Sequence, residues 1–201
     1  MKNMDPKYII ELTVKLFATC LIVAGLLGVV NKVTAPNIAA INKAKTEEAM
    51  KAVVADADNS TFSDPMEITA EMEAAAASAG ASVAEAYEVQ VGGAVAGHAL
   101  KIVASGSQGS IEMMVGLDVE GVVTGVSVVK NSETAGIGSK VMENEPNSKG
   151  VGVLDQFIGK SAADGTLNVG SNVDAITGAT VSTKGVTTGV NAAIAVAGVM
   201  G

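Results

Sequence analysis

The 201-residue sequence has few of the residue types that build metal centres and hydrolytic active sites. It contains one cysteine, Cys20, one histidine, His98, and no tryptophan. A single cysteine excludes a disulfide within the chain and a multi-cysteine cluster site. A single histidine excludes a multi-histidine metal site. We therefore expect no metal site, and no set of catalytic side chains stands out.

Basic residues are also scarce. Lys and Arg number 13 against 21 Asp and Glu, which gives a formal net charge of −8. An acidic chain without a basic patch is a poor partner for nucleic acid. Aromatic residues make up 2% of the chain and hydrophobic residues 48%. We therefore expect a small core of Ala, Val, Ile and Met.

One long hydrophobic run lies near the N-terminus. Residues 12–33 are almost wholly apolar, with Lys15 near one end and Lys32 near the other. About 22 residues at about 1.5 Å each reach about 33 Å, enough to cross the hydrocarbon core of a bilayer. A cleavable signal peptide would have a shorter apolar core, and a buried helix of a globular domain would show a polar face. The run predicts a transmembrane helix over 12–33 after a tail of residues 1–11.

The lysines flanking this run do not decide its orientation. They are nearly balanced in number before and after the hydrophobic segment. The positive-inside rule compares these flanking lysines and arginines, so it leaves both orientations open.

The rest of the chain changes from helical to strand-like patterns. Apolar residues at helical spacing predict helices over 36–57, starting at Pro36, and over 68–79 and 181–200. Apolar or alternating runs predict strands over 87–91, 97–104, 111–118 and 122–129, with turns at 92–93 and 119–121. We predict an α+β fold with an antiparallel sheet and flanking helices. Residues 34–86 form a helical connector and the first part of the domain, and residues 87–201 form its main part.

Two polar segments are candidates for a ligand site. One is Asp174-Ala175-Ile176-Thr177-Gly178-Ala179-Thr180-Val181-Ser182-Thr183. A helix is expected to begin there, and the N–H groups of a helix start bind phosphate; an ordinary Ser or Thr N-cap needs similar residues. The other is Asn131-Ser132-Glu133-Thr134-Ala135-Gly136-Ile137-Gly138-Ser139-Lys140, which could cradle a polar ligand or form a plain turn. Each pattern alone leaves both interpretations open.

Together, and in this order, the segments resemble the FMN-binding domain shared by two respiratory complexes. These are the Rnf ferredoxin:NAD oxidoreductase, in its G subunit, and the sodium-pumping NADH:quinone reductase, in its C subunit. The family's Ser/Thr-Gly-Ala-Thr motif matches Thr177-Gly178-Ala179-Thr180, and its Glu-Thr-Pro-Gly-Leu-Gly motif matches residues 133–138. The hairpin at 118–126, Gln156-Phe157, Thr19-Cys20 and the membrane exit at 31–36 also match, so the resemblance covers nearly the whole chain.

The sequence departs from the family pattern at three places. Ala135 replaces a proline, Asn131 stands where a histidine is common, and residues 106–109 read Gly-Ser-Gln-Gly instead of Gly-Tyr-Gly-Gly. The missing tyrosine leaves an aromatic contact there without support. None of the three departures changes the threonine of the Ser/Thr-Gly-Ala-Thr motif.

The resemblance implies that FMN is attached to Thr180 through a phosphoester. The other residues that it implies as flavin contacts are Thr177, Gly178, Ala179, Val181, Glu133, Thr134, Gly136, Ile137 and Gly138. It further implies an electron-carrying subunit of an ion-translocating complex in the cytoplasmic membrane. Its expected partners are the other subunits of the complex, membrane lipid, and a flavin transferase that makes the phosphoester bond. The family places the FMN-binding domain, here 87–201, on the extracytoplasmic side.

Three other functions fit parts of the same pattern. A C-type subunit of the quinone reductase has the same motif, but a chain of about 200 residues resembles the Rnf G subunit, because the C subunit is longer. A membrane-tethered flavin sensory module would not purify with other redox subunits. An assembly subunit without a cofactor would lose any yellow colour on acid precipitation.

Overall fold

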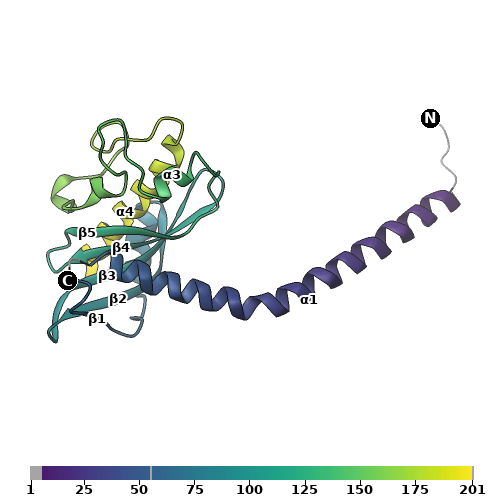
Figure 1. The fold of residues 1–201 in the computed structure, drawn as a ribbon, viewed down its shortest axis with the longest axis horizontal. Helices are drawn as coiled ribbons and strands as arrows, with labels where there is room; N and C mark the ends of the chain where they lie inside the picture. Colours follow the sequence, from purple (N-terminus) through teal and green to yellow (C-terminus); the bar gives the residue numbers. More distant parts are fainter. Residues whose placement is uncertain (1–5, 55, 201) are drawn as a thin grey trace. The chain divides into compact units, whose positions relative to one another are not determined.

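The computed structural model describes residues 6–54 and 56–200. They fall into two compact units that meet within a helix, one ending at Ala44 and one beginning at Lys45. The first unit contains most of helix α1, and the second contains the end of α1 together with a sheet and its covering helices (Figure 1).

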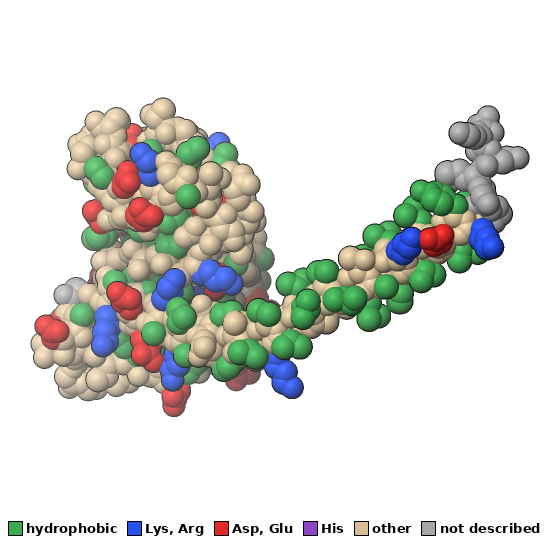
Figure 2. Space-filling model, turned by 45° about the vertical axis from the view of Figure 1, so that its right-hand side comes forward, with side chains coloured by type: hydrophobic (Ala, Val, Ile, Leu, Met, Phe, Trp, Pro, Cys, Tyr) green, Lys and Arg blue, Asp and Glu red, His purple; other side chains and the backbone are tan. Residues whose placement is uncertain are grey.

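Helix α1 spans Pro6–Ala52 and is the one described helix that is long and apolar enough to cross a membrane. Hydrophobic side chains cover much of its exposed surface (Figure 2). Lys15 Nζ and Glu11 Oε1 are paired at 2.6 Å near the start of the helix. The hydroxyls of Thr13, Thr19 and Thr34 each donate to the carbonyl four residues earlier. This pairing satisfies their polar groups inside an apolar helix, as lipid surroundings require.

Two expectations for this region need correction. Pro36 does not open a new helix, because it lies inside α1 and the helix continues through it. The helix also ends at Ala52 and not near residue 57. The early end has a packing reason, since the backbone at Val53 lies against the sheet, next to Gly116 and Gly125.

Five antiparallel strands form a meander in the order β1-β2-β3-β4-β5. Their bounds are β1 Ser60–Phe62, β2 Ala81–Val91, β3 Ala94–Ser105, β4 Ser110–Asp118 and β5 Val123–Lys130. The four strands and both turns predicted from the sequence are confirmed, but β2 begins at Ala81 and not at residue 87, and β1 was not predicted. Gly92, Gly93 and Gly121 all adopt positive φ in the turns, a conformation that glycine takes without strain.

One face of the sheet carries the main core. Helices α2, Ala70–Ser78, and α4, Thr180–Met200, pack together and against this face. Both helices were predicted. Leu100, Ile102 and Met113 of the sheet are fully buried there against Val186 and Val190 of α4.

The other face of the sheet holds a smaller core built around the end of α1. Ala49, Met50 and Val53 pack against Ala99 and Met114 of the central strands. The sheet is therefore covered on both faces, and the end of α1 is part of the folded domain.

The segment between β5 and α4 is mostly irregular. It contains the short helix α3, Ser139–Met142, and the 3-10 turns η1, Asp155–Phe157, and η2, Ala162–Asp164. Helix α3 and the first turns of α4 lie at the same end of the sheet (Figure 1). Phe157 is fully buried and attaches this segment to the main core.

Candidate functional site

The Thr177–Thr180 motif forms the entry to helix α4. Thr180 is the first residue of the helix and is exposed, while Ala179 beside it is buried. The Ala179 N–H donates to the Ile176 carbonyl at 2.9 Å, and Gly178 has a φ of +87°. The motif is thus a tight turn that presents Thr180 at the surface.

The 133–138 segment is a second turn, placed between β5 and α3. The N–H groups of Ile137 and Ser139 both donate to the Thr134 carbonyl at 3.2 Å, and the Gly136 N–H donates to Ser139 Oγ at 2.9 Å. Thr134, Gly136 and Ile137 are exposed, whereas Gly138 is buried. The outer part of this turn is accessible to a ligand, and its last residue packs inward.

The two turns meet through a hydrogen bond across 49 residues of sequence. Ser182 Oγ, in the first turn of α4, donates to Glu133 Oε2. The other carboxylate oxygen, Glu133 Oε1, accepts from Ser107 N at 2.7 Å and Gln108 N at 3.3 Å, in the turn between β3 and β4. Glu133 therefore joins three segments, which we call the Glu133 junction (residues 106–109, 131–138 and 180–185).

Glycines leave the space that the Glu133 junction occupies. A Cβ on Gly106 would overlap Glu133 Oε1, and one on Gly138 would lie 2.5 Å from Glu133 Oε2 and 2.8 Å from Ser182 Oγ. A Cβ on Gly185 would lie 2.6 Å from the Ser105 carbonyl oxygen. At Gly106 and Gly138 the Glu133 side chain would have to move to make room, and at Gly185 the backbone would, so the junction keeps this geometry only with glycine at all three positions.

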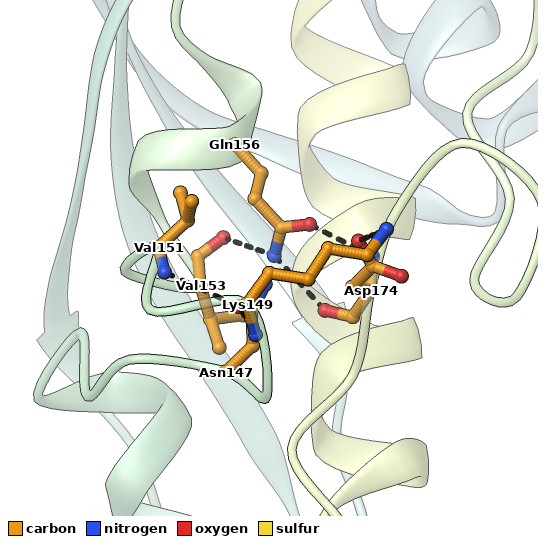
Figure 3. A network of polar contacts seen from close by, with 6 residues as sticks. All are labelled: Asn147, Lys149, Val151, Val153, Gln156 and Asp174. Carbon is orange, nitrogen blue, oxygen red and sulfur yellow. Dashed lines mark hydrogen bonds and ion pairs between the residues drawn. The ribbon is translucent and has the colours of Figure 1, made fainter.

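A polar network holds the chain just before the Thr177–Thr180 motif (Figure 3). Gln156 Nε2 donates to the Asp174 carbonyl at 2.9 Å, and the Asp174 N–H donates to Gln156 Oε1 at 2.8 Å. Lys149 Nζ forms an ion pair with Asp174 Oδ2 at 2.7 Å. Gln156, which the family resemblance includes, thus fixes Asp174, and with it the approach to Thr177.

The same network contains one residue that sequence reasoning missed. Asn147 Oδ1 accepts from the N–H groups of Lys149 at 2.8 Å and Val151 at 3.2 Å. Those two donors fix the oxygen in place, so the amide nitrogen points away from them. Among the described residues, Asn147 Nδ2 is the one buried side-chain polar atom without a partner. In the sequence it is an ordinary Asn between Pro146 and Ser148, without a motif that marks it.

The other residues singled out in the sequence lie elsewhere. His98 is on β3, where burial lowers its pKa and the nearby charge of Glu88 opposes that effect. Cys20 is exposed on α1. No group of three or more His, Cys, Asp or Glu suited to a metal ion occurs within residues 6–54 and 56–200.

A cluster of interacting ionisable groups lies on β2 and β3. Tyr87 and Lys101 both donate to the Glu85 carboxylate, at 2.6 and 3.1 Å. Burial raises the pKa of Glu85, but these two hydrogen bonds and the charge of Lys101 together outweigh burial and lower that pKa overall. Burial and the Glu85 charge raise the pKa of Tyr87. This cluster stabilises the β2–β3 pair and has no contact with the junction.

Two hollows of the domain lie at the far end of α4. One of about 540 Å³ is lined by residues such as Thr166, Asn191 and Ile194, and one of about 200 Å³ by His98 and Glu120 among others. Ile194 comes 14 residues after Thr180, or about 21 Å along a helix. These hollows are thus distant from the candidate site, where Thr180, Val181 and Ile137 are exposed.

Comparison with known proteins assigns this domain to a class. The family model described as an FMN-binding domain matches residues 106–195. The matched region begins at the β3–β4 turn and contains the whole Glu133 junction together with Thr180.

Full-length relatives narrow the class further. The G subunit of the sodium-translocating ferredoxin:NAD oxidoreductase complex of Acetobacterium woodii is 33% identical over 96% of this chain and 94% of its own length. The G subunit of the proton-translocating ferredoxin:NAD oxidoreductase complex of Clostridium ljungdahlii is 26% identical over the same shares. The G subunit of an ion-translocating oxidoreductase complex from Methanosarcina acetivorans is 33% identical over 53% of this chain and 54% of its own length. The chain belongs to the family of G subunits of ion-translocating oxidoreductase complexes.

Proposed function

We propose that this chain carries one FMN, held by a phosphoester to Thr180 Oγ, and transfers electrons within an ion-translocating ferredoxin:NAD oxidoreductase complex. The observation that carries the proposal is the position of Thr180, which is exposed at the first residue of α4 inside the matched FMN-binding region. Similarity to G subunits over 94% of their length favours this complex over the quinone reductase.

The residues around Thr180 fit a phosphate at this position. The first N–H groups of a helix have no partner within the helix and point toward its start. Together with the helix dipole they stabilise an anion there. Gly178 has a positive φ, and a Cβ added to it would meet nothing within 4 Å, so its backbone is open to a ligand.

The 134–138 turn fits the rest of the flavin. Gly136 has a φ of +77° with open space beside it, which allows a ligand to approach its backbone closely. Ile137 is 51% and Val181 57% exposed. These two apolar side chains, one from each turn, suit the apolar face of an isoalloxazine ring. We propose contacts from Glu133, Thr134, Gly136, Ile137 and Gly138, largely through the backbone, and from Thr177 to Val181.

Attachment of the flavin needs an activated donor. The Thr180 Oγ–H bond breaks, an Oγ–P bond forms, and the bond from that phosphorus to its leaving group breaks. The donor is a flavin nucleotide activated as a phosphoanhydride, whose departing nucleotide phosphate is the leaving group. A separate flavin transferase supplies the base that takes the proton.

Once bound, FMN supplies the electron-transfer chemistry, and the protein supplies binding and orientation. The chain then needs no catalytic acid or base of its own. Its residues hold the phosphate at the start of α4 and present the ring at an open surface. An open surface lets the flavin approach redox partners in the other subunits.

The proposal includes an anchor in the lipid of the cytoplasmic membrane, formed by residues 12–33, and an extracytoplasmic domain. The apolar exposed surface of α1 supports the anchor, while the side rests on the family resemblance. Protease added to intact cells without a wall is expected to digest the domain and leave the membrane helix. Protection until lysis would put the domain inside and refute the orientation.

Denatured protein tests the attachment. Acid-precipitated chain is expected to stay yellow, and Thr180→Val is expected to give a colourless chain that still folds. Thr166→Val is a matched control, because Thr166 is another exposed threonine of the matched region. Yellow Thr180→Val protein after denaturation would refute attachment at this residue.

A further inference from the structure

We propose that Glu133 is a positioning residue, which fixes the first turn of α4 so that Thr180 Oγ is presented for flavin attachment. It acts through Ser182 and not by touching the flavin with its carboxylate. This inference rests on the proposed function in one respect, the phosphoester at Thr180. The new element is that formation of this bond depends on Glu133.

The Glu133 carboxylate is engaged by the protein itself. Oε2 accepts from Ser182 Oγ, and Oε1 accepts from the N–H groups of Ser107 and Gln108. Glu133 N donates to Asn131 Oδ1 at 3.1 Å, which holds its own backbone in place. Hydrogen bonds to an ionised carboxylate are stronger than those between neutral groups, so this carboxylate is held firmly by the chain.

Two glycines that no turn requires lie against this carboxylate. Gly138 has a φ of −67°, which any residue adopts. What the position does require is space, because a Cβ would lie 2.5 Å from Glu133 Oε2. Gly106, likewise outside the positive-φ glycines, would place its Cβ on Glu133 Oε1. Two segments therefore use glycine to make room for this one carboxylate.

Ser182 occupies the part of α4 that most needs an outside contact. It lies two residues after Thr180, in the turn whose N–H groups have no partner within the helix. Ser182 is only 2% exposed, so water cannot replace Glu133 as its acceptor without rearrangement. Because helix ends fray, the buried contact is what keeps this turn, and hence Thr180, in one conformation.

In this role Glu133 acts through its hydrogen bonds and not through its negative charge. No ion pair found among the described residues involves Glu133. A glutamine can accept from Ser107 and Gln108 with its oxygen and donate to Ser182 Oγ with its amide nitrogen. Glu133→Gln therefore preserves the junction, whereas Glu133→Ala removes it.

The test measures flavin attachment on the full chain. Each variant is produced with the flavin transferase, and intact mass gives the flavinylated fraction at times before the wild type is complete. The variants are Glu133→Ala, Glu133→Gln and Ser182→Ala. Glu112→Ala is the matched control, because Glu112 is another partly buried carboxylate, paired with Lys130 on the sheet. The midpoint of thermal unfolding is measured for all of them.

Glu133→Ala and Ser182→Ala are expected to slow attachment about tenfold, the effect of losing about 1.4 kcal/mol of hydrogen bonding. Glu133→Gln is expected to stay within about twofold of wild type, because it rebuilds the contact. Equal losses in Glu133→Gln and Glu133→Ala would overturn the positioning role, and so would an equal loss in Glu112→Ala with a matching drop in unfolding midpoint. Wild-type rates in Glu133→Ala and Ser182→Ala would also overturn it. An unmodified wild-type chain would instead refute the proposed function.

Discussion

The packing of α1 against the sheet depends on two glycines, and replacing one of them tests this dependence. Gly116 of β4 and Gly125 of β5 are paired across the strands. Because neither residue has a side chain, the backbone of Val53 packs directly against both of them. A Cβ on Gly125 would lie 2.7 Å from Val53 Cα. Thr124 Oγ1 donates to the Val53 carbonyl at 2.6 Å and holds Val53 in this position. We predict that Gly125→Ala forces the end of α1 off the sheet.

The size of the effect follows from what the end of α1 buries. Val53 is fully buried and Met50 is 6% exposed, and burying such a side chain is worth about 1.5–3 kcal/mol. If α1 stays in place instead, an extra methyl in a packed core costs about 1–3 kcal/mol. Either outcome lowers the free energy of unfolding of the domain by about 1 kcal/mol or more.

Denaturant unfolding of the full chain in detergent, followed by circular dichroism, measures this loss. Gly198→Ala is the matched control, because a Cβ there meets nothing within 4 Å and alanine is the better helix former. It is expected to leave stability unchanged or slightly raised. If the free energy of unfolding of Gly125→Ala stays within about 0.5 kcal/mol of wild type, well below the usual overpacking cost, the packing of Val53 is not the reason for these glycines.

Three further predictions concern other parts of the domain. Asn147→Ala removes the acceptor for two backbone N–H groups and is expected to cost about 1–2 kcal/mol in denaturant unfolding, whereas Lys149→Met breaks an exposed ion pair and should cost less than about 1 kcal/mol. Because burial lowers the pKa of His98, the unfolded state binds its proton more readily; domain stability is therefore expected to fall as pH drops below about 6.5, the ordinary histidine value. His98→Gln should flatten that pH dependence, and an unchanged slope would contradict the assignment. Gly136→Val forces a branched side chain into a φ of +77° and should reduce flavin loading or shift the flavin potential, while unchanged loading and redox titration would remove this turn from the site.

The sequence predicted the parts of the fold that depend on local pattern. Alternating and apolar runs located β2 to β5, and helical spacing located α2 and α4, because a half-buried strand or helix imposes its own period on the residues. The helix boundary predicted at Pro36 was wrong. Proline is common in the first turn of a helix, but it is also tolerated inside a membrane helix, so its position alone does not distinguish the two cases. Strand β1 has three residues on the sheet edge, too few to show a period.

The site was predictable in its residues but not in its geometry. Thr180 and the 133–138 segment could be found from motif resemblance, yet nothing local indicates that Glu133 bonds Ser182, because 49 residues separate them. Gly138 was part of the matched motif, but only the structure shows that it makes room for the Glu133 carboxylate. Asn147 could not be found, since its importance depends on burial by the surrounding chain.

The mass of one peptide tests the central claim most directly. Cleavage after Lys160 and Lys184 releases residues 161–184, which contain Thr177, Thr180, Ser182 and Thr183. For protein purified from its native membrane, we predict the mass of this peptide plus one esterified FMN, with fragmentation placing the increment on Thr180. An unmodified peptide from the native protein, or an increment on any of the other hydroxyls, would contradict attachment at Thr180.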